Sequence, residues 1–283
     1  MIYQFGLIAK DIKNSVTPIV YDRFSRDLGI EEHFEILNIP EDKLQETLEY
    51  ARRHFNGFNI TMPYKQAALA YMDELDESAV KCGSTNTVLV RDGKLIAYNT
   101  DGWGLIRALE DQGICVAGKR VVMLGAGGVA SSIAYNLSIN RASSVDVVNL
   151  FPEQAEALCQ KFGEGFTPYP LSYPVLAERC KGADLFINAS VMGQLGYDEF
   201  QTFDFLDNMA PGAAVFDVNY SNPNSKLVPT ALAKGMPAFK GRRMTACQGI
   251  RAISIWTGRE PSRQATEALI ADFEAMDQGV QEK

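Results

Sequence analysis

Three clusters of polar side chains lie where predicted strands end, which is the place at which open α/β sheets bind ligands. Ser15 and Thr17 are two hydroxyls spaced i, i+2 at a predicted helix start. They could both donate to one carboxylate, or they could cap the helix. Lys65 follows Asn59 and Thr61 after a short strand and could act as an acid–base group. A lone lysine is more often a solvated surface residue, so each cluster needs support from its context.

The third cluster joins Asn86 to the run Asn99-Thr100-Asp101. Asn and Asp side chains at two strand ends could bind a ligand, or they could simply form turns. Considered singly, each of the three clusters is better explained by local structure than by chemistry. Their value as evidence depends on the elements that would bring them together.

A glycine-rich turn gives the clearest sign of a ligand. The apolar run Val121–Leu124 breaks into glycines and then into small residues suited to a helix. Gly125, Gly127 and Ala130 fit G-x-G-x-x-G/A, in which the glycines form the turn and let the backbone approach a pyrophosphate. A second strand, Val145–Val148, follows about one βαβ unit later. We therefore predict nucleotide binding rather than a purely structural turn.

The elements around these residues alternate between strands and helices, which predicts an α/β fold. The second half is a Rossmann-type, doubly wound parallel sheet, and Asp92-Gly93 is a hairpin signal that gives the first half a mixed sheet. We expect two domains: residues 1–101 plus 242–283 form an α/β substrate domain, and residues 102–241 bind the dinucleotide. The chain would cross between them near Asp101–Trp103 and near Gly241–Arg243, before a helix over Thr245–Thr257.

Composition narrows the function classes. The 283 residues carry a formal net charge of -8, which argues against nucleic acid or an anionic membrane as a partner. The chain has no 18-residue apolar run and no signal peptide, so we expect a cytoplasmic protein. Five scattered cysteines support neither a disulfide framework nor a zinc site, and two histidines offer little for a metal site or a Ser-His-Asp triad.

Several longer motifs occur together and in order. They are GFNITMPYK (57–65), GSTNT (83–87), YNTDGWG (98–104) and GAGGVA (125–130). With them the chain resembles the shikimate/quinate dehydrogenase family nearly end to end. SVTP at 15–18 looks like that family's Ser-x-Ser-Pro, INAS at 187–190 like its Asn-Ala-Thr-Ser, and DVNY at 217–220 like its Asp-x-x-Tyr. Met244 and Gln248 fit its Met-x-x-x-Gln helix start, and Trp-Thr-Gly at 256–258 follows.

The resemblance implies hydride transfer between a nicotinamide cofactor and shikimate, with Lys65 and Asp101 as the acid–base pair. The substrate would be a polyhydroxylated cyclic carboxylate. The implied substrate-binding residues are Ser15, Thr17, Asn59, Thr61, Asn86, Tyr220 and Gln248. The implied cofactor-binding residues are Gly125, Ala126, Gly127, Gly128, Val129, Ala130, Asn149, Leu150, Asn188, Ala189, Ser190, Val218, Gly241 and Met244.

One departure from the family concerns the cofactor. Many NADP-using members carry Asn-Arg-Thr after the second strand of the nucleotide domain, with the arginine on the 2′-phosphate. Here Asn149-Leu150-Phe151 stands there, and no Lys or Arg occurs between Asn149 and Lys161. A phosphate dianion without a cation would be poorly stabilised. The sequence therefore predicts NAD or NADP as cofactor, with NAD favoured.

Other departures concern the substrate. Thr17 replaces a serine and adds a methyl beside the expected carboxylate, and Ser190-Val191 stands where Thr-Ser is usual. Arg242-Arg243 replaces small residues and could be solvated, or could contact pyrophosphate or the substrate carboxylate.

Three alternatives to a shikimate dehydrogenase therefore stay open. The alternative most similar in chemistry is a quinate dehydrogenase. The other two are an amino-acid dehydrogenase and a non-catalytic family member that binds a nucleotide or a polyol. We expect a monomer or a homodimer.

Overall fold

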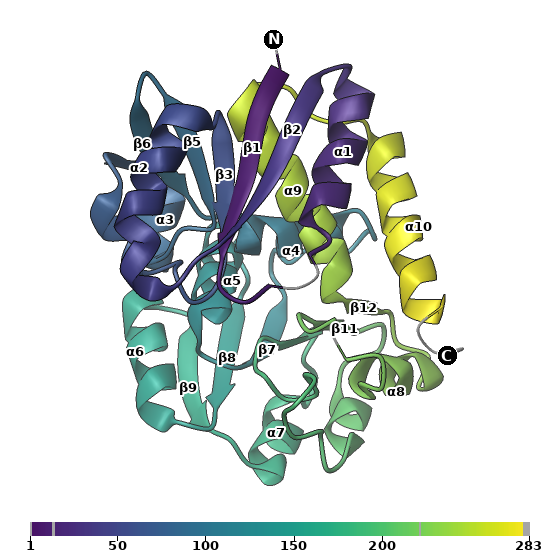
Figure 1. The fold of residues 1–283 in the computed structure, drawn as a ribbon. Coiled ribbons are helices and arrows are strands. Elements are labelled where there is room, and N and C mark those ends of the chain that lie inside the picture. Colours follow the sequence, from purple (N-terminus) through teal and green to yellow (C-terminus); the bar gives the residue numbers. More distant parts are fainter. Residues whose placement is uncertain (1, 13–14, 221, 280–283) are drawn as a thin grey trace. The chain divides into compact units, whose positions relative to one another are not determined.

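The chain folds into two compact units, each built around one sheet (Figure 1). The computed structural model describes residues 2–12, 15–220 and 222–279. The first unit contains the chain up to Gly104 together with Ala246–Asp272, and the second contains Leu105–Thr245 and the chain from Phe273 onward. The prediction of a two-domain α/β protein is confirmed.

The first unit has a mixed six-stranded sheet in the order β2-β1-β3-β5-β6-β4. Its strands β1, β2 and β3 are parallel, whereas β5 is antiparallel to β3 and to β6. Asp92 and Gly93 join β5 to β6 with φ of 53° and 73°, as the Asp-Gly hairpin signal predicts. The strands are β1 Ile2–Ala9, β2 Glu31–Asn38, β3 Gly57–Ile60, β4 Glu74–Leu75, β5 Thr87–Arg91 and β6 Lys94–Tyr98.

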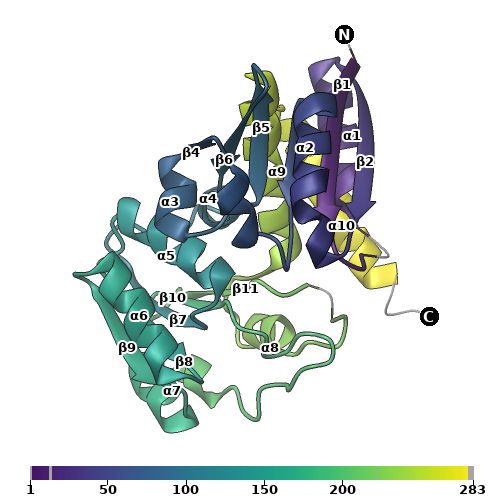
Figure 2. The ribbon, with the colours of Figure 1, turned by 60° about the vertical axis from the view of Figure 1, so that its left-hand side comes forward.

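Helices cover both faces of this sheet, as Figure 2 shows from the side. The helix α2 (Leu44–His54) packs with β3 in an apolar cluster that includes Leu48 and Phe58. On the opposite face, α1 (Thr17–Leu28) and α9 (Gly241–Thr257) meet where Gly249 lies against Val20. The remaining helices are the short α3 (Glu77–Cys82) and α10 (Arg263–Gly279), with 3-10 turns at Glu41–Lys43 and Ala67–Tyr71.

The second unit has a six-stranded, wholly parallel sheet in the order β12-β11-β10-β7-β8-β9. The central strands of this sheet are nearly continuous apolar runs because helices cover both faces. The strands are β7 Arg120–Leu124, β8 Ser144–Asn149, β9 Phe166–Pro170, β10 Leu185–Asn188, β11 Ala214–Asp217 and β12 Ala238–Lys240. The helices are α5 Gly128–Ile139, α6 Pro152–Phe162, α7 Tyr173–Arg179 and α8 Leu227–Ala233, with a 3-10 turn at Asp204–Asn208. The helix α4 (Asp101–Glu110) begins in the first unit and continues into the second from Leu105.

Two local expectations were wrong. The helix expected over Thr245–Thr257 begins at Gly241, directly after β12, so its first turn includes Gly241–Arg243. The strand β9 was not expected, because Pro168 and Pro170 interrupt it. Prolines are tolerated there because β9 stands at the edge of the sheet, next to β8. Within the described ranges, no helix has both the length and the apolarity needed to cross a membrane.

Candidate active site

Lys65 and Asp101 form an ion pair in the first unit. Lys65 follows β3, and its main-chain oxygen accepts a hydrogen bond from Thr85 N at 2.8 Å. Asp101 is the first residue of α4. Lys65 Nζ donates to Asp101 Oδ2 at 2.7 Å, and the two side chains are 25% and 6% exposed. A lysine ammonium has three donors, so Lys65 can hold this carboxylate and still offer protons to another molecule.

Asn86 fixes the other oxygen of Asp101. Its Nδ2 donates to Asp101 Oδ1 at 2.7 Å, and its Oδ1 accepts from Thr100 N at 2.8 Å and from Thr87 Oγ1 at 3.0 Å. All four residues are buried. Because a buried polar group is costly to leave unpaired, this network holds the carboxylate in one orientation.

Asn99 forms a turn, which is one of the two roles predicted for the Asn and Asp residues of this cluster. Its Oδ1 accepts from Asp101 N at 3.1 Å, which is an Asx turn, and its Nδ2 donates to Ser84 O at 3.1 Å. This cluster therefore forms a turn and can also take part in chemistry, because the turn places the Asp101 carboxylate beside Lys65.

Asn59 belongs to the same network. Its Nδ2 donates to Asn86 O at 2.9 Å and to Thr87 Oγ1 at 3.2 Å, and its Oδ1 accepts from Tyr21 OH at 2.6 Å. One lone pair of Asn59 Oδ1 remains for a further donor. Thr61 follows β3, bonds to Ile8 O through its main-chain N at 3.1 Å, and is half-buried.

Ser15 and Thr17 stand at the start of α1. Ser15 Oγ donates to Thr17 Oγ1 at 2.9 Å and accepts from Thr17 N at 3.2 Å. The N-cap residue itself, Val16, has no side chain that caps the helix. Ser15 thus satisfies one N–H at this helix start, and the Thr17 hydroxyl keeps its own proton for an acceptor.

Gln248 and Tyr220 lie in different units. Gln248 is half-buried on α9 in the first unit, and its side chain makes no hydrogen bond to another described residue. Tyr220 follows β11 in the second unit, where the guanidinium of Arg242 lies over its ring at 5.4 Å. Arg242 also lies 5.9 Å from the ring of Phe273, so it packs on aromatic rings. Arg243 is half-buried on α9.

The glycine-rich turn lies between β7 and α5 in the second unit. Gly125 has φ of +111°, and a Cβ there would lie 2.6 Å from Ala189 O, so only glycine fits. A Cβ on Gly127 or Gly128 would meet nothing within 4 Å, so packing within the protein does not require glycine at either position. The start of α5 has no side-chain cap, which leaves its N–H groups available to an anion. These features fit a dinucleotide pyrophosphate.

The other predicted residues of this turn also line it. Ala126 and Val129 are half-buried, and Ala130 is fully buried. The motif requires this pattern of exposed glycines followed by a buried alanine, because the residue at its last position lies where the helix packs on the strand.

The end of β8 carries Asn149 and Leu150. Asn149 is buried, and its Nδ2 donates to Phe151 O at 3.0 Å and to Gln154 Oε1 at 3.1 Å. Leu150 is 65% exposed. Lys161, the next cation along the chain, donates to Ser131 Oγ at 3.1 Å.

The ends of β10 and β11 are tied together. Asn188 Nδ2 donates to Asp217 Oδ1 at 3.0 Å, and Asn188 Oδ1 accepts from Ser190 Oγ at 2.7 Å. Burial raises the pKa of Asp217 to about 7, although hydrogen bonds from Asn219 N, Asn188 and Ser225 favour its ionised form. Buried Ala189, half-buried Val218 and buried Met244 are the other predicted cofactor residues here. A Cβ on Gly241 would lie 1.9 Å from Val218 O.

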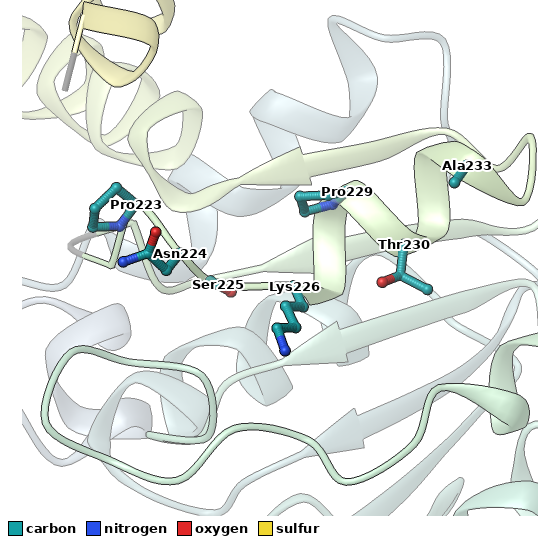
Figure 3. Close-up of a pocket in the computed structure, with 7 residues that line it drawn as sticks. All are labelled: Pro223, Asn224, Ser225, Lys226, Pro229, Thr230 and Ala233. Atoms are coloured by element: carbon teal, nitrogen blue, oxygen red, sulfur yellow. The ribbon is translucent and has the colours of Figure 1, made fainter. Parts of the chain in front are cut away.

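A separate shallow pocket of about 380 Å³ lies beside α8 (Figure 3). Its lining includes Lys226 and Thr230 but none of the predicted site residues. Across the ranges that the structure describes, no group of three or more His, Cys, Asp or Glu side chains could hold a metal ion.

Direct hydrogen bonds thus join Lys65, Asp101, Asn86 and Asn59 in one cluster. Thr100, from the expected run Asn99-Thr100-Asp101, also belongs to the cluster, whereas Thr87 and Tyr21 were not expected. Thr87 stands inside the GSTNT motif, which could have indicated it. Tyr21 gave no such signal, because an aromatic residue at helical spacing is typical of a core position.

Two family models match the chain. The "Shikimate dehydrogenase substrate binding domain" matches residues 7–88, and "Shikimate / quinate 5-dehydrogenase" matches residues 108–196. A relative named shikimate dehydrogenase (NADP(+)), from Alkaliphilus metalliredigens, is 33% identical over 261 residues, which cover 90% of this chain and 91% of that protein.

Two similar solved structures hold ligands. Shikimate 5-dehydrogenase from Thermus thermophilus, in complex with NADP(H) and shikimate, has a TM-score of 0.84 at 29% identity and covers 96% of this chain and 99% of its own. Shikimate 5-dehydrogenase from Listeria monocytogenes, in complex with shikimate and NAD, has a TM-score of 0.84 at 26% identity and covers 95% and 96%. The two relatives thus hold the same small molecule with different dinucleotides.

Proposed function

Since this chain belongs to the shikimate/quinate dehydrogenase family and is an NAD(P)-dependent oxidoreductase, we propose that it interconverts shikimate and 3-dehydroshikimate. The observation that carries this proposal is the 2.7 Å contact between Lys65 Nζ and Asp101 Oδ2, with Asn86 on the other carboxylate oxygen. A protein that only bound a nucleotide or a polyol would have no use for a positioned acid–base pair. The structures of relatives bound to shikimate point to the substrate class.

The proposed chemistry uses Lys65 as the proton-transfer group. When bound, the nicotinamide gives a hydride to the carbonyl carbon of the substrate or takes it back. The oxygen left on that carbon gains negative charge and needs a proton, which Lys65 Nζ supplies. In the oxidation direction the lysine takes the proton from the hydroxyl. Asp101 keeps the ammonium aimed at this oxygen and accepts from a neighbouring substrate hydroxyl through a remaining lone pair.

The other polar groups of the first unit would bind the rest of the substrate. The hydroxyls of Ser15 and Thr17 would take its carboxylate at the start of α1, where the helix dipole favours an anion. Asn59, Thr61, Asn86 and Gln248 would meet its ring hydroxyls, and Tyr220 would add a further contact. Because an unmatched buried polar group costs about 1–3 kcal/mol, such a set selects polyols over simple ketones.

We further propose that residues 1–101 plus 242–283 bind the substrate and residues 102–241 bind the dinucleotide. The open space at Gly127 and Gly128 and the uncapped start of α5 support a pyrophosphate there. The residues at the ends of β8, β10 and β11, from Asn149 to Val218, together with Gly241 and Met244, would hold the ribose and nicotinamide. We propose a monomer or homodimer that acts in the cytoplasm on this small molecule, without nucleic acid or membrane partners.

We propose NAD as the preferred dinucleotide. Leu150 offers a 2′-phosphate no charge, and the Asn149 amide is already committed to Phe151 O and Gln154. Lys161 is engaged with Ser131. A 2′-phosphate would therefore lose its water without gaining a cation from this loop, whereas a 2′-hydroxyl needs none.

A steady-state screen of shikimate and quinate, each with NAD and with NADP, tests both parts of the proposal. Reduction of NAD with shikimate as the best substrate supports it. Turnover of quinate in preference to shikimate would transfer the assignment to quinate dehydrogenase. Absence of turnover with every pair, from folded protein, would favour the binding-only alternative.

A further inference from the structure

Tyr21 stands behind the acid–base pair at the far end of a chain of hydrogen bonds. Its hydroxyl donates to Asn59 Oδ1 at 2.6 Å, Asn59 Nδ2 donates to Asn86 O at 2.9 Å, and Asn86 Nδ2 donates to Asp101 Oδ1 at 2.7 Å. Lys65 closes the chain on Asp101 Oδ2. The chain connects α1, β3, the start of β5 and the start of α4, all within the first unit.

The donor directions along this chain are fixed. Asn86 O can only accept, so it selects the Nδ2 side of the Asn59 amide. Asn59 Oδ1 therefore faces Tyr21, and the tyrosine must donate. Burial raises the pKa of Tyr21 far above its ordinary value, so the hydroxyl keeps its proton at every working pH. The last lone pair of Asn59 Oδ1 then remains an acceptor, which matches a hydroxyl donor on a polyol.

The ring of Tyr21 is held as firmly as its hydroxyl. Tyr21 is only 2% exposed. It stacks on Phe34 with ring centroids 5.4 Å apart and an interplanar angle of 16°, and it lies 4.8 Å from the ring of Trp256 and 6.1 Å from that of Phe5. Because these rings leave the side chain no alternative position, the hydroxyl reaches Asn59 without an entropic cost on each turnover.

We propose that Tyr21 is a positioning residue for the reaction, acting through Asn59 and Asn86 to fix the carboxylate that orients Lys65. This inference rests on the proposed function for its kinetic consequence. Tyr21 itself touches neither reacting atom. Its contribution is to keep the amide of Asn59, and with it the amino-terminal end of β5, in the place that Asp101 requires.

Tyr21→Phe is the informative variant, because it keeps the ring and removes only the hydroxyl. We expect kcat with the preferred acid and dinucleotide to fall about tenfold, because a small misplacement of a catalytic group is costly. The KM for the dinucleotide should not change, and the pH profile of kcat should shift. The matched control is Phe34→Leu, which weakens the packing of the same ring but removes no hydrogen bond.

The control separates positioning from general loss of stability. Phe34→Leu should lower the Tm at least as much as Tyr21→Phe, yet keep kcat within about twofold and leave the pH profile in place. Equal kinetic losses in the two variants, or an unchanged kcat in Tyr21→Phe, would overturn the proposal.

A second measurement needs no turnover. The Tm values of Tyr21→Phe, Asp101→Asn and the double variant form a cycle, and distant independent sites are expected to be additive. We expect the double variant to lose less than the sum of the single losses, because either change breaks the same chain. Additive losses of Tm would show that Tyr21 and Asp101 are not coupled through these hydrogen bonds, and would overturn the proposal. If the wild-type protein turned over neither shikimate nor quinate, the proposed function would be wrong, but the Tm cycle would still test whether Tyr21 is coupled to Asp101.

Discussion

Lys65 Nζ and Asp101 Oδ2 lie 2.7 Å apart, and the pair joins a lysine in a turn after β3 to the first residue of α4. Asp101 is bound on both oxygens, by Lys65 and by Asn86, whereas Lys65 has donors to spare. The carboxylate is therefore the fixed member of the pair and the ammonium is the member that can exchange a proton. This asymmetry is the basis of the proposed mechanism.

Gly125→Ala should destabilise the protein by about 2–4 kcal/mol, because it combines a left-handed φ with a Cβ against Ala189 O. Chemical denaturation would measure this loss. Wild-type stability in Gly125→Ala would mean that the turn does not have the described conformation.

Gly127→Ala should behave in the opposite way. Its φ of -78° suits alanine, and its Cβ would meet no protein atom within 4 Å. We expect stability within about 0.5 kcal/mol of wild type and a KM for the dinucleotide raised about tenfold, because the added methyl would occupy space next to the pyrophosphate. An unchanged KM for the dinucleotide would show that the pyrophosphate does not bind at this turn.

Leu150→Arg should move the cofactor preference toward NADP. A guanidinium at this exposed position could bind a 2′-phosphate, so we expect kcat/KM for NADP to rise about tenfold with little change for NAD. Leu150→Gln is the control, since it adds polarity without charge and should not improve NADP. A wild-type enzyme that already strongly prefers NADP would contradict the proposed NAD preference.

Asp217→Asn should change how stability depends on pH. The folded pKa of Asp217, about 7, lies above the ordinary value of 3.8. The neutral form is therefore favoured by folding, and its contribution is complete below about pH 4 and is lost as the pH rises through 7. Asparagine keeps an oxygen for Asn188 and Asn219 and carries no charge.

Denaturation at several pH values tests this expectation. The difference in unfolding free energy between Asp217→Asn and wild type should grow in favour of the variant from pH 4 to pH 8, by at most about 4 kcal/mol. A difference that stays constant, or that grows in favour of wild type, would show that the folded protein does not raise this pKa.

The sequence allowed the fold class to be predicted because its signals are local. Apolar runs alternating with helical segments predicted β7, β8, β10 and β11, and Asp92-Gly93 predicted the β5–β6 hairpin. The proline-bearing edge strand β9 could not be predicted in this way, because its assignment depends on pairing with β8. The early start of α9 was likewise not predicted; Gly241 there lies close to Val218, a residue distant in the sequence.

In the candidate site, too, local motifs could be read from the sequence, whereas contacts between distant residues could not. Lys65, Asn86 and Asp101 could be named because they stand in motifs of a known family, and the shikimate dehydrogenase relationship is confirmed by the comparisons. Their hydrogen bonds could not be predicted, since they join residues far apart in the chain. Tyr21 and Asn59, which are 38 residues apart, meet only when α1 packs on the sheet.

The most direct test of the central claim is steady-state shikimate oxidation by Lys65→Ala, with Lys94→Ala as control. Lys94 pairs with Glu74 on the surface of the same unit. We expect kcat of Lys65→Ala to fall on the order of 100-fold or more, with little change in the KM for the dinucleotide, and kcat of Lys94→Ala to stay near wild type. Near-normal turnover by Lys65→Ala would contradict the account, because the reaction would then obtain its proton elsewhere.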